Sequence, residues 1–173
     1  MRIHLVSAIM VGLVGSGIPL GLAEKVTLIF CVQLVFFAEI LNSVIEALVD
    51  LAIQEFDEKA RVAKDAGAAG VLVLAIGTVT IFAAILVYNW ETVMTHGEAV
   101  LRQFALGIPL SICAGLLIAD LRKPAWLDGA LSLVALLLFA ASAIRSPSYV
   151  FSAMTFGLLV VCGAAAVVRR RGG

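Results

Sequence analysis

Apolar residues occur along this chain in long runs that are separated by short polar segments. Each run approaches the roughly 20 mostly apolar residues that a helix needs to cross a bilayer. Six such runs cover residues 5–23, 26–53, 66–90, 104–119, 126–144 and 148–168. Pro124 and Pro147 fall between runs, where proline is expected to break helices, whereas Pro109 lies inside the short fourth run. The ten-residue alternating strands of a β-barrel do not occur. The pattern therefore predicts an all-α, polytopic helical membrane protein.

The composition supports this class and excludes others. The chain has 173 residues, of which 62% are hydrophobic and 14% are charged. Soluble domains are nearer 45–50% apolar with about a quarter of their residues charged, so a soluble enzyme is excluded, as is intrinsic disorder. The formal net charge is zero, which indicates no nucleic-acid partner. Cys31, Cys113 and Cys162 lie in apolar runs, and we interpret them as small buried hydrophobic residues.

Basic residues indicate the orientation, because Lys and Arg accumulate on cytoplasmic loops. With the N-terminus inside and six spans, nine basic residues face the cytoplasm, namely Arg2, Lys59, Arg61, Lys64, Arg122, Lys123, Arg169, Arg170 and Arg171. Only three, Lys25, Arg102 and Arg145, face outward. The count predicts both termini in the cytoplasm. Residues 1–23 also fit a signal peptide, but the run is long for one and has a single flanking Arg.

The second run carries an unusual set of polar residues. Their offsets of i, i+3, i+4, i+7 and i+11 place them on one helical face, and they are Glu39, Asn42, Ser43, Glu46 and Asp50. An ionisable group at membrane depth costs about 2.5–3.5 kcal/mol and is a functional candidate by default. Three carboxylates on one stripe also repel one another unless cations lie between them. The stripe is therefore the leading candidate site.

The depth of these residues suggests a division of roles. Counted from Val26 at 1.5 Å per residue, Glu46 lies about 30 Å along the helix, which is roughly one hydrocarbon thickness. Glu46 and Asp50 are therefore expected at the cytoplasmic interface, and Glu39 about 10 Å deeper. A deeper carboxylate could address the hydroxyl of a lipid, while the shallower pair could hold a metal ion at the water boundary.

The segment that follows is polar and ends in small residues. Residues 54–65 mix acids and bases, which alone is typical of a solvated loop, and Ala66-Gly67-Ala68-Ala69-Gly70 follows directly. Small residues at a helix start let another backbone approach closely, and exposed N–H groups there favour phosphate. Helix packing alone is the alternative interpretation of this run.

At this point the residues match a known pattern. The segment from Glu39 to Asp50 reads EILNSVIEALVD, and Lys64-Asp65-Ala66-Gly67 follows it after 13 residues. This ExxN[ST]xIExxxD pattern, followed by KD and small residues, resembles the prokaryotic diacylglycerol kinase and undecaprenol kinase family. The resemblance covers about residues 2–90 and includes the Arg2-Ile3-His4 start. It implies a kinase-like domain of three spans over residues 1–90, followed by a three-span extension of unknown role over residues 91–173.

The resemblance also implies an activity and a site. The family comprises trimeric membrane kinases in which MgATP donates its γ-phosphoryl group to a lipid alcohol, at sites shared between subunits on the cytoplasmic side. By position, Glu39 resembles the general base and Glu46 a Mg²⁺ ligand that also contacts the nucleotide. The other nucleotide-binding positions would be Glu55, Asp57, Lys64 and Asp65, with Asn42, Ser43, Asp50 and Arg2 in supporting or substrate-binding roles.

The substrate and the catalytic competence of this chain each have alternatives. Diacylglycerol, converted to phosphatidic acid, is the first expectation for the substrate, and undecaprenol, converted to undecaprenyl phosphate, is the second. The family carries a further metal-binding Glu on an N-terminal surface helix, and by alignment it would fall ahead of Met1. A catalytically impaired pseudokinase is therefore one non-enzymatic alternative, and a small carrier with Glu39 as its proton site is another. No phosphate loop of the GxxxxGK[ST] type and no soluble-kinase signature is present.

Overall fold

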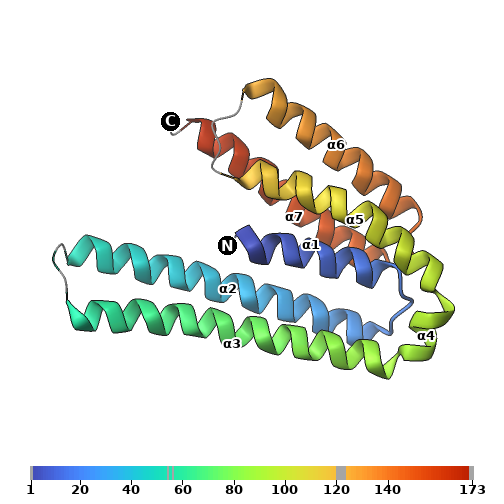
Figure 1. The fold of residues 1–173 in the computed structure, drawn as a ribbon, viewed down its shortest axis with the longest axis horizontal. Coiled ribbons are helices and arrows are strands. Elements are labelled where there is room, and N and C mark those ends of the chain that lie inside the picture. The colour runs from blue at the N-terminus through green and yellow to red at the C-terminus, as the bar shows by residue number, and fades with distance from the viewer. Residues whose placement is uncertain (1, 54, 56, 120–123, 172–173) are drawn as a thin grey trace. The chain divides into compact units, whose positions relative to one another are not determined.

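The computed structural model describes residues 2–53, 55, 57–119 and 124–171, and these residues are helical apart from short connections. No strand occurs among them, which confirms the predicted all-α class. The helices, labelled in Figure 1, are α1 (Arg2–Ser16), α2 (Leu22–Ala52), α3 (Glu58–Tyr88), α4 (Trp90–Thr95), α5 (Gly97–Ile118), α6 (Ala125–Ile144) and α7 (Tyr149–Arg171).

Four of these helices, α2, α3, α5 and α6, are long and apolar enough to cross a membrane. The apolar parts of α1 and α7, Ile3–Ser16 and Tyr149–Ala164, are shorter. At 1.5 Å per residue the α1 segment covers about 21 Å, less than the roughly 30 Å of a hydrocarbon core. The fold is thus that of a polytopic membrane protein with four supported spans, and the crossing of α1 and α7 stays a prediction.

Several predicted boundaries were wrong, and local chemistry explains each difference. The first run was expected to extend to residue 23, but α1 ends at Ser16, because Pro19 lacks the N–H that would continue the helix. The third helix begins at Glu58 rather than near residue 66, because Asp57 Oδ1 accepts a hydrogen bond from the Ala60 N–H at 3.0 Å and caps it.

The proline positions were predicted with mixed success. The fourth run was expected to begin near residue 104, but α5 starts at Gly97 and continues through Pro109. Proline inside a helix is tolerated in membrane proteins, because neighbouring groups satisfy the freed backbone. Pro124 and Pro147 lie outside the helices, as the sequence predicted.

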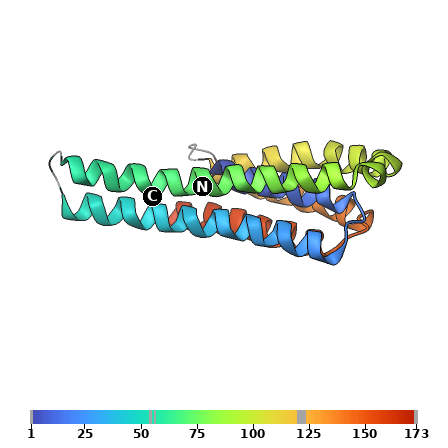
Figure 2. The ribbon, with the colours of Figure 1, turned by 90° about the horizontal axis from the view of Figure 1, so that it is seen from below.

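The chain forms two compact units, of which the first spans Val26–Tyr88 and consists of most of α2 together with α3. The two helices run antiparallel and side by side, as Figures 1 and 2 show. Only Val71 is buried among the described residues of α3, so most of the apolar surface of that helix is exposed. Such a surface suits lipid or a further protein subunit rather than water.

The second unit combines Arg2–Lys25 with the chain from Asn89 onward. Here α1 packs against α5 and α7, and α5 also packs against α6. Glycines permit the close approach of α1: a Cβ atom at Gly12 would lie 2.6 Å from Thr155 Oγ1, and one at Gly15 would lie 2.9 Å from the buried Phe151 ring. The compact units therefore divide the chain differently from the predicted kinase-like and extension domains, whose boundary at residue 90 stays a prediction.

Some of the polar side chains in the second unit form hydrogen bonds that connect its helices. Gln103 is 2% exposed, donates a hydrogen bond to the Ser142 carbonyl at 3.2 Å and accepts one from the Ser142 hydroxyl. Ser146 donates to the Ser16 carbonyl at 3.2 Å. Because unpaired polar groups are costly in an apolar interior, these bonds join α6 to α5 and the α6–α7 turn to the end of α1.

We predict that Gly15→Ala destabilises the protein, because the new methyl group meets the enclosed Phe151 ring. Overpacking of this kind costs about 1–3 kcal/mol, and each kcal/mol lowers the Tm of a chain of this size by about 2–4 °C. Gly157→Ala in α7 is the control, since a Cβ atom there meets nothing within 4 Å. Thermal unfolding of both variants in detergent measures the difference, and equal Tm values would contradict the packing described.

Candidate functional site

The polar stripe of α2 changes from buried to exposed along the helix. Glu39 is 8% exposed and is the most buried of its members. Asn42, one turn further on, is half-buried, and Glu46 and Asp50 are exposed. Ser43 belongs to the same run of residues and is also exposed. Glu39 is thus enclosed by the protein and Glu46 is accessible, whereas the predicted depth of the two glutamates in a bilayer stays a prediction.

Asn42 connects the stripe to α3. Its Nδ2 donates a hydrogen bond to Glu46 Oε1 at 2.8 Å, one turn along the same helix. Its Oδ1 points at Gly67 of α3, where a Cβ atom would overlap it. The absence of a side chain at Gly67 therefore lets the α3 backbone approach the amide that holds Glu46.

Charged residues join the two helices nearer the connection. Lys64 of α3 forms an ion pair with Asp50 of α2. Asp65 is exposed and lies 3.5 Å from the Arg61 guanidinium on its own helix, and its expected role at a nucleotide stays a prediction. Arg61 also pairs with Glu58. Sequence reasoning did not single out Arg61, although its spacing of three and four residues from these acids is typical of helical ion pairs.

The remaining predicted residues lie outside this cluster. Glu55 is exposed in the connection between α2 and α3, and Asp57 caps α3 through its carboxylate. Arg2 begins α1 in the second compact unit, and its side chain lies outside the described part of the structure. The structure therefore brings together Asn42 with Glu46, and Asp50 with Lys64.

One proposed role of the small-residue run was wrong. A phosphate site at its N–H groups required Ala66–Gly70 to begin a helix, but these residues lie in the third and fourth turns of α3. Their N–H groups are inside the helix, where the carbonyls four residues earlier accept them. Gly67 supports the alternative interpretation, helix packing, because a Cβ atom there would meet side chains of α2. A Cβ atom at Gly70 would meet nothing within 4 Å.

The carboxylates of the α2 stripe are the residues that could bind a magnesium ion. Among the described residues, no group of three or more His, Cys, Asp or Glu side chains is placed to hold a metal. Magnesium bound with nucleotide phosphates needs fewer protein ligands, commonly one or two carboxylates. Glu46 meets this requirement, because it is an exposed carboxylate whose Oε1 is already oriented by Asn42. The site fits a Mg²⁺ ion shared with phosphates and not one enclosed by protein alone.

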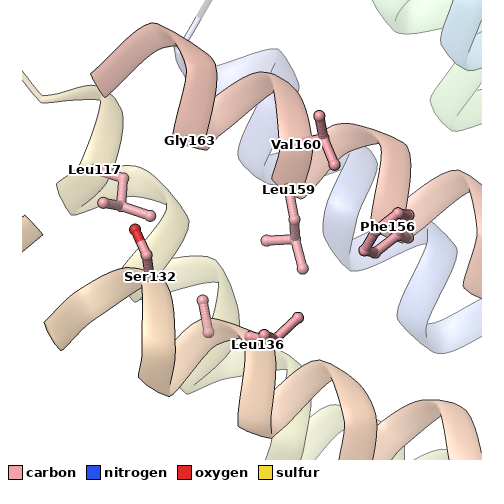
Figure 3. A pocket seen from close by; sticks show the side chains of 8 residues that line it. Leu117, Ser132, Leu136, Phe156, Leu159, Val160 and Gly163 are labelled. Carbon is pink, nitrogen blue, oxygen red and sulfur yellow. The ribbon is translucent and has the colours of Figure 1, made fainter. Parts of the chain in front are cut away.

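A cavity in the second unit carries no comparable chemistry. It has a volume of about 160 Å³ and is lined almost entirely by apolar side chains of α5, α6 and α7, shown in Figure 3. Ser132 is the one lining residue with a polar side chain, and its hydroxyl donates to the Asp128 carbonyl at 2.7 Å. This cavity is therefore no competitor to the α2 stripe as a catalytic site.

Comparison with known proteins identifies a family for the first half of the chain. The sequence profile of the prokaryotic diacylglycerol kinase family matches residues 1–86, which contain α1, α2 and nearly all of α3. Through this half, the chain belongs to the prokaryotic diacylglycerol kinase family, whose members are membrane lipid kinases. No curated protein and no solved structure matches the chain.

We predict that the Asp50–Lys64 ion pair contributes little to stability. The two side chains are 67% and 37% exposed, and exposed pairs typically contribute about 0.2–1 kcal/mol. A double-mutant cycle with Asp50→Asn and Lys64→Met, followed by Tm in detergent, should give a coupling below about 1 kcal/mol. A coupling above about 2 kcal/mol would show that the pair is desolvated in the folded protein.

Proposed function

We propose that this protein is an ATP-dependent membrane lipid kinase that converts diacylglycerol to phosphatidic acid. One observation carries the proposal: a single face of α2 presents a buried carboxylate, Glu39, and two turns further an exposed one, Glu46. Phosphoryl transfer to a lipid needs both environments, because the acceptor hydroxyl comes from the apolar phase and the nucleotide from water. Membership in the diacylglycerol kinase family supports the same reaction class.

Glu39 is proposed as the general base. Its carboxylate would accept the proton of the lipid hydroxyl as the oxygen attacks the γ-phosphorus, while the bond to the β-phosphate breaks and ADP leaves. Proton transfer by a positioned carboxylate contributes about 10²–10⁴-fold to such rates. Enclosure of this side chain, which is 8% exposed, would exclude water as a competing acceptor.

Glu46 is proposed to hold Mg²⁺ together with the phosphates of ATP. The bound ion would neutralise charge on the phosphates and orient the γ-phosphoryl group. Asn42 would keep the Glu46 carboxylate in place through the 2.8 Å hydrogen bond from its Nδ2. The helical rise from Glu39 to Glu46 is about 10 Å, which leaves room for a phosphoryl group between the two side chains.

Lys64 and Asp50 are proposed to form the nucleotide side of the site. The Lys64 ammonium already faces α2 through its ion pair with Asp50, and a phosphate could compete for the same cation. Asp65, Glu55 and Asp57 are exposed and are proposed as further nucleotide contacts. Ser43 and Arg2 complete the supporting positions carried over from the family resemblance.

The surroundings of the site are part of the proposal. The excess of basic residues on the predicted inner segments supports a bacterial inner-membrane location with the site facing the cytoplasm. The exposed apolar surface of α3 is compatible with a homotrimer in which neighbouring subunits share each site.

We predict that purified protein in mixed micelles transfers label from [γ-³²P]ATP with Mg²⁺ to diacylglycerol. Glu39→Gln should lower the rate by about 10²–10⁴-fold, because it removes the base. Glu46→Gln should lower it by about 10²-fold or more, because it removes the metal ligand. Glu98→Gln is the matched control, since Glu98 is an exposed acid at the start of α5, outside the proposed site.

The acceptor is decided in the same assay by offering undecaprenol separately. Label in undecaprenol and none in diacylglycerol would replace the substrate and keep the kinase. Label in neither lipid, from protein with a normal Tm, would contradict the kinase and favour a pseudokinase. Label that persists in both glutamate variants would contradict the assigned residues.

We also predict opposite accessibility for the starts of α3 and α5. Glu58 and Glu98 are both exposed residues in first turns, and a cysteine at each can be labelled with a membrane-impermeant maleimide. The native cysteines, Cys31, Cys113 and Cys162, are buried and give little background. In spheroplasts, Glu98→Cys should react from outside and Glu58→Cys only after permeabilisation. The reverse order would overturn the proposed orientation.

A further inference from the structure

Gly67 of α3 lies against Asn42 in the stripe of α2. A Cβ atom there would overlap Asn42 Oδ1 and would lie 3.6 Å from Ile45 Cδ1. Gly70, one turn further along α3, has nothing within 4 Å of its Cβ position. The two glycines share a helix and a sequence run, so only their contacts distinguish them.

The Asn42 amide has its nitrogen toward Glu46 and its oxygen toward Gly67. The atom that faces Glu46 Oε1 at 2.8 Å must be the nitrogen, because an amide oxygen at that distance would repel the carboxylate. Oδ1 consequently faces Gly67, and this atom is buried without a hydrogen-bond partner in the described structure. The amide group is planar, so a rotation that moves Oδ1 away from α3 also moves Nδ2 away from Glu46.

We propose that Gly67 is a positioning residue for Glu46, which acts through the Asn42 amide. A methyl group at position 67 would displace Oδ1, turn the amide and release the carboxylate from its hydrogen bond. The part of this inference that concerns metal binding rests on the proposed kinase function. The contact between Gly67 and Asn42 does not, because it is a property of the helix pair alone.

The contact is tested by a double-mutant cycle on the full chain in detergent micelles, with Tm as the readout. Gly67→Ala should lower Tm by about 3 °C or more, because the overlap is relieved only by moving the amide or the helix. Gly70→Ala should leave Tm unchanged or raise it, because alanine is the better helix former and the space is open. In an Asn42→Ala background, Gly67→Ala should cause no further loss, since the overlapping oxygen is gone. Additive losses, or equal effects of the two alanines, would overturn the inference.

The positioning role is tested by the Mg²⁺ dependence of lipid phosphorylation. Gly67→Ala should raise the Mg²⁺ concentration for half-maximal rate and lower kcat, each by about tenfold, because a misplaced ligand weakens the site. Gly70→Ala should leave both values unchanged. A loss of kcat at unchanged Mg²⁺ dependence would overturn the route through Glu46. If the wild-type chain shows no kinase activity, the proposed function fails, and the Tm cycle still decides whether Gly67 and Asn42 are coupled.

Discussion

The dominant physical constraint on this structure is the cost of placing carboxylates on an apolar helix of membrane length. Each ionisable group at membrane depth costs about 2.5–3.5 kcal/mol, and the charges on one face also repel one another. In the α2–α3 pair, two of the carboxylates on α2 have polar partners. Asn42 supplies an N–H group to Glu46 from within α2, and Lys64 supplies a positive charge to Asp50 from α3. One of these partners lies on α2 itself and the other on α3, and the exposed Asp50–Lys64 pair is expected to add little stability.

The second unit shows that the C-terminal half is not an independent addition. The family match ends at residue 86, yet α1, which lies inside the match, packs against α5 and α7 beyond it. The fit depends on Gly12 and Gly15, whose missing side chains leave space for Thr155 and Phe151. Truncation before α5 would expose the apolar residues of α1. The extension is therefore integrated with the first helix of the kinase-like half.

Much of the fold follows from sequence because apolar runs and helical spacing are local properties. The i, i+3, i+4, i+7 pattern placed Glu39 and Glu46 on one face, and the structure adds that Glu39 is enclosed by the protein. The true start of α3 was missed, because residues 54–65 were interpreted as a loop by their charge. Asp57 followed by Glu58 and, three residues later, Arg61 was an available helix-start signal.

The contacts of the site could not be predicted, because they depend on the rotation of α3 about its axis. The sequence of Ala66–Gly70 gives no reason to prefer one glycine over the other as the point of approach. Gly67 and Gly70 are only about 60° apart around the helix axis but about 4.5 Å apart along it, so Gly67 can contact Asn42 while Gly70 remains open. The same rotation brings Lys64 to Asp50 and leaves Asp65 beside Arg61.

Glycine therefore has two different structural roles in this protein. In α1 it lets helices pack closely, and a larger residue there would disturb only packing. In α3 it lets the backbone lie against a polar side chain whose other end holds a carboxylate, so a larger residue would disturb the orientation of a charged group. Packing between apolar helices in lipid is driven mainly by close contact, and small residues provide it. Where that contact includes Asn42, the packing of the helix pair and the geometry of the candidate site are determined by the same atoms.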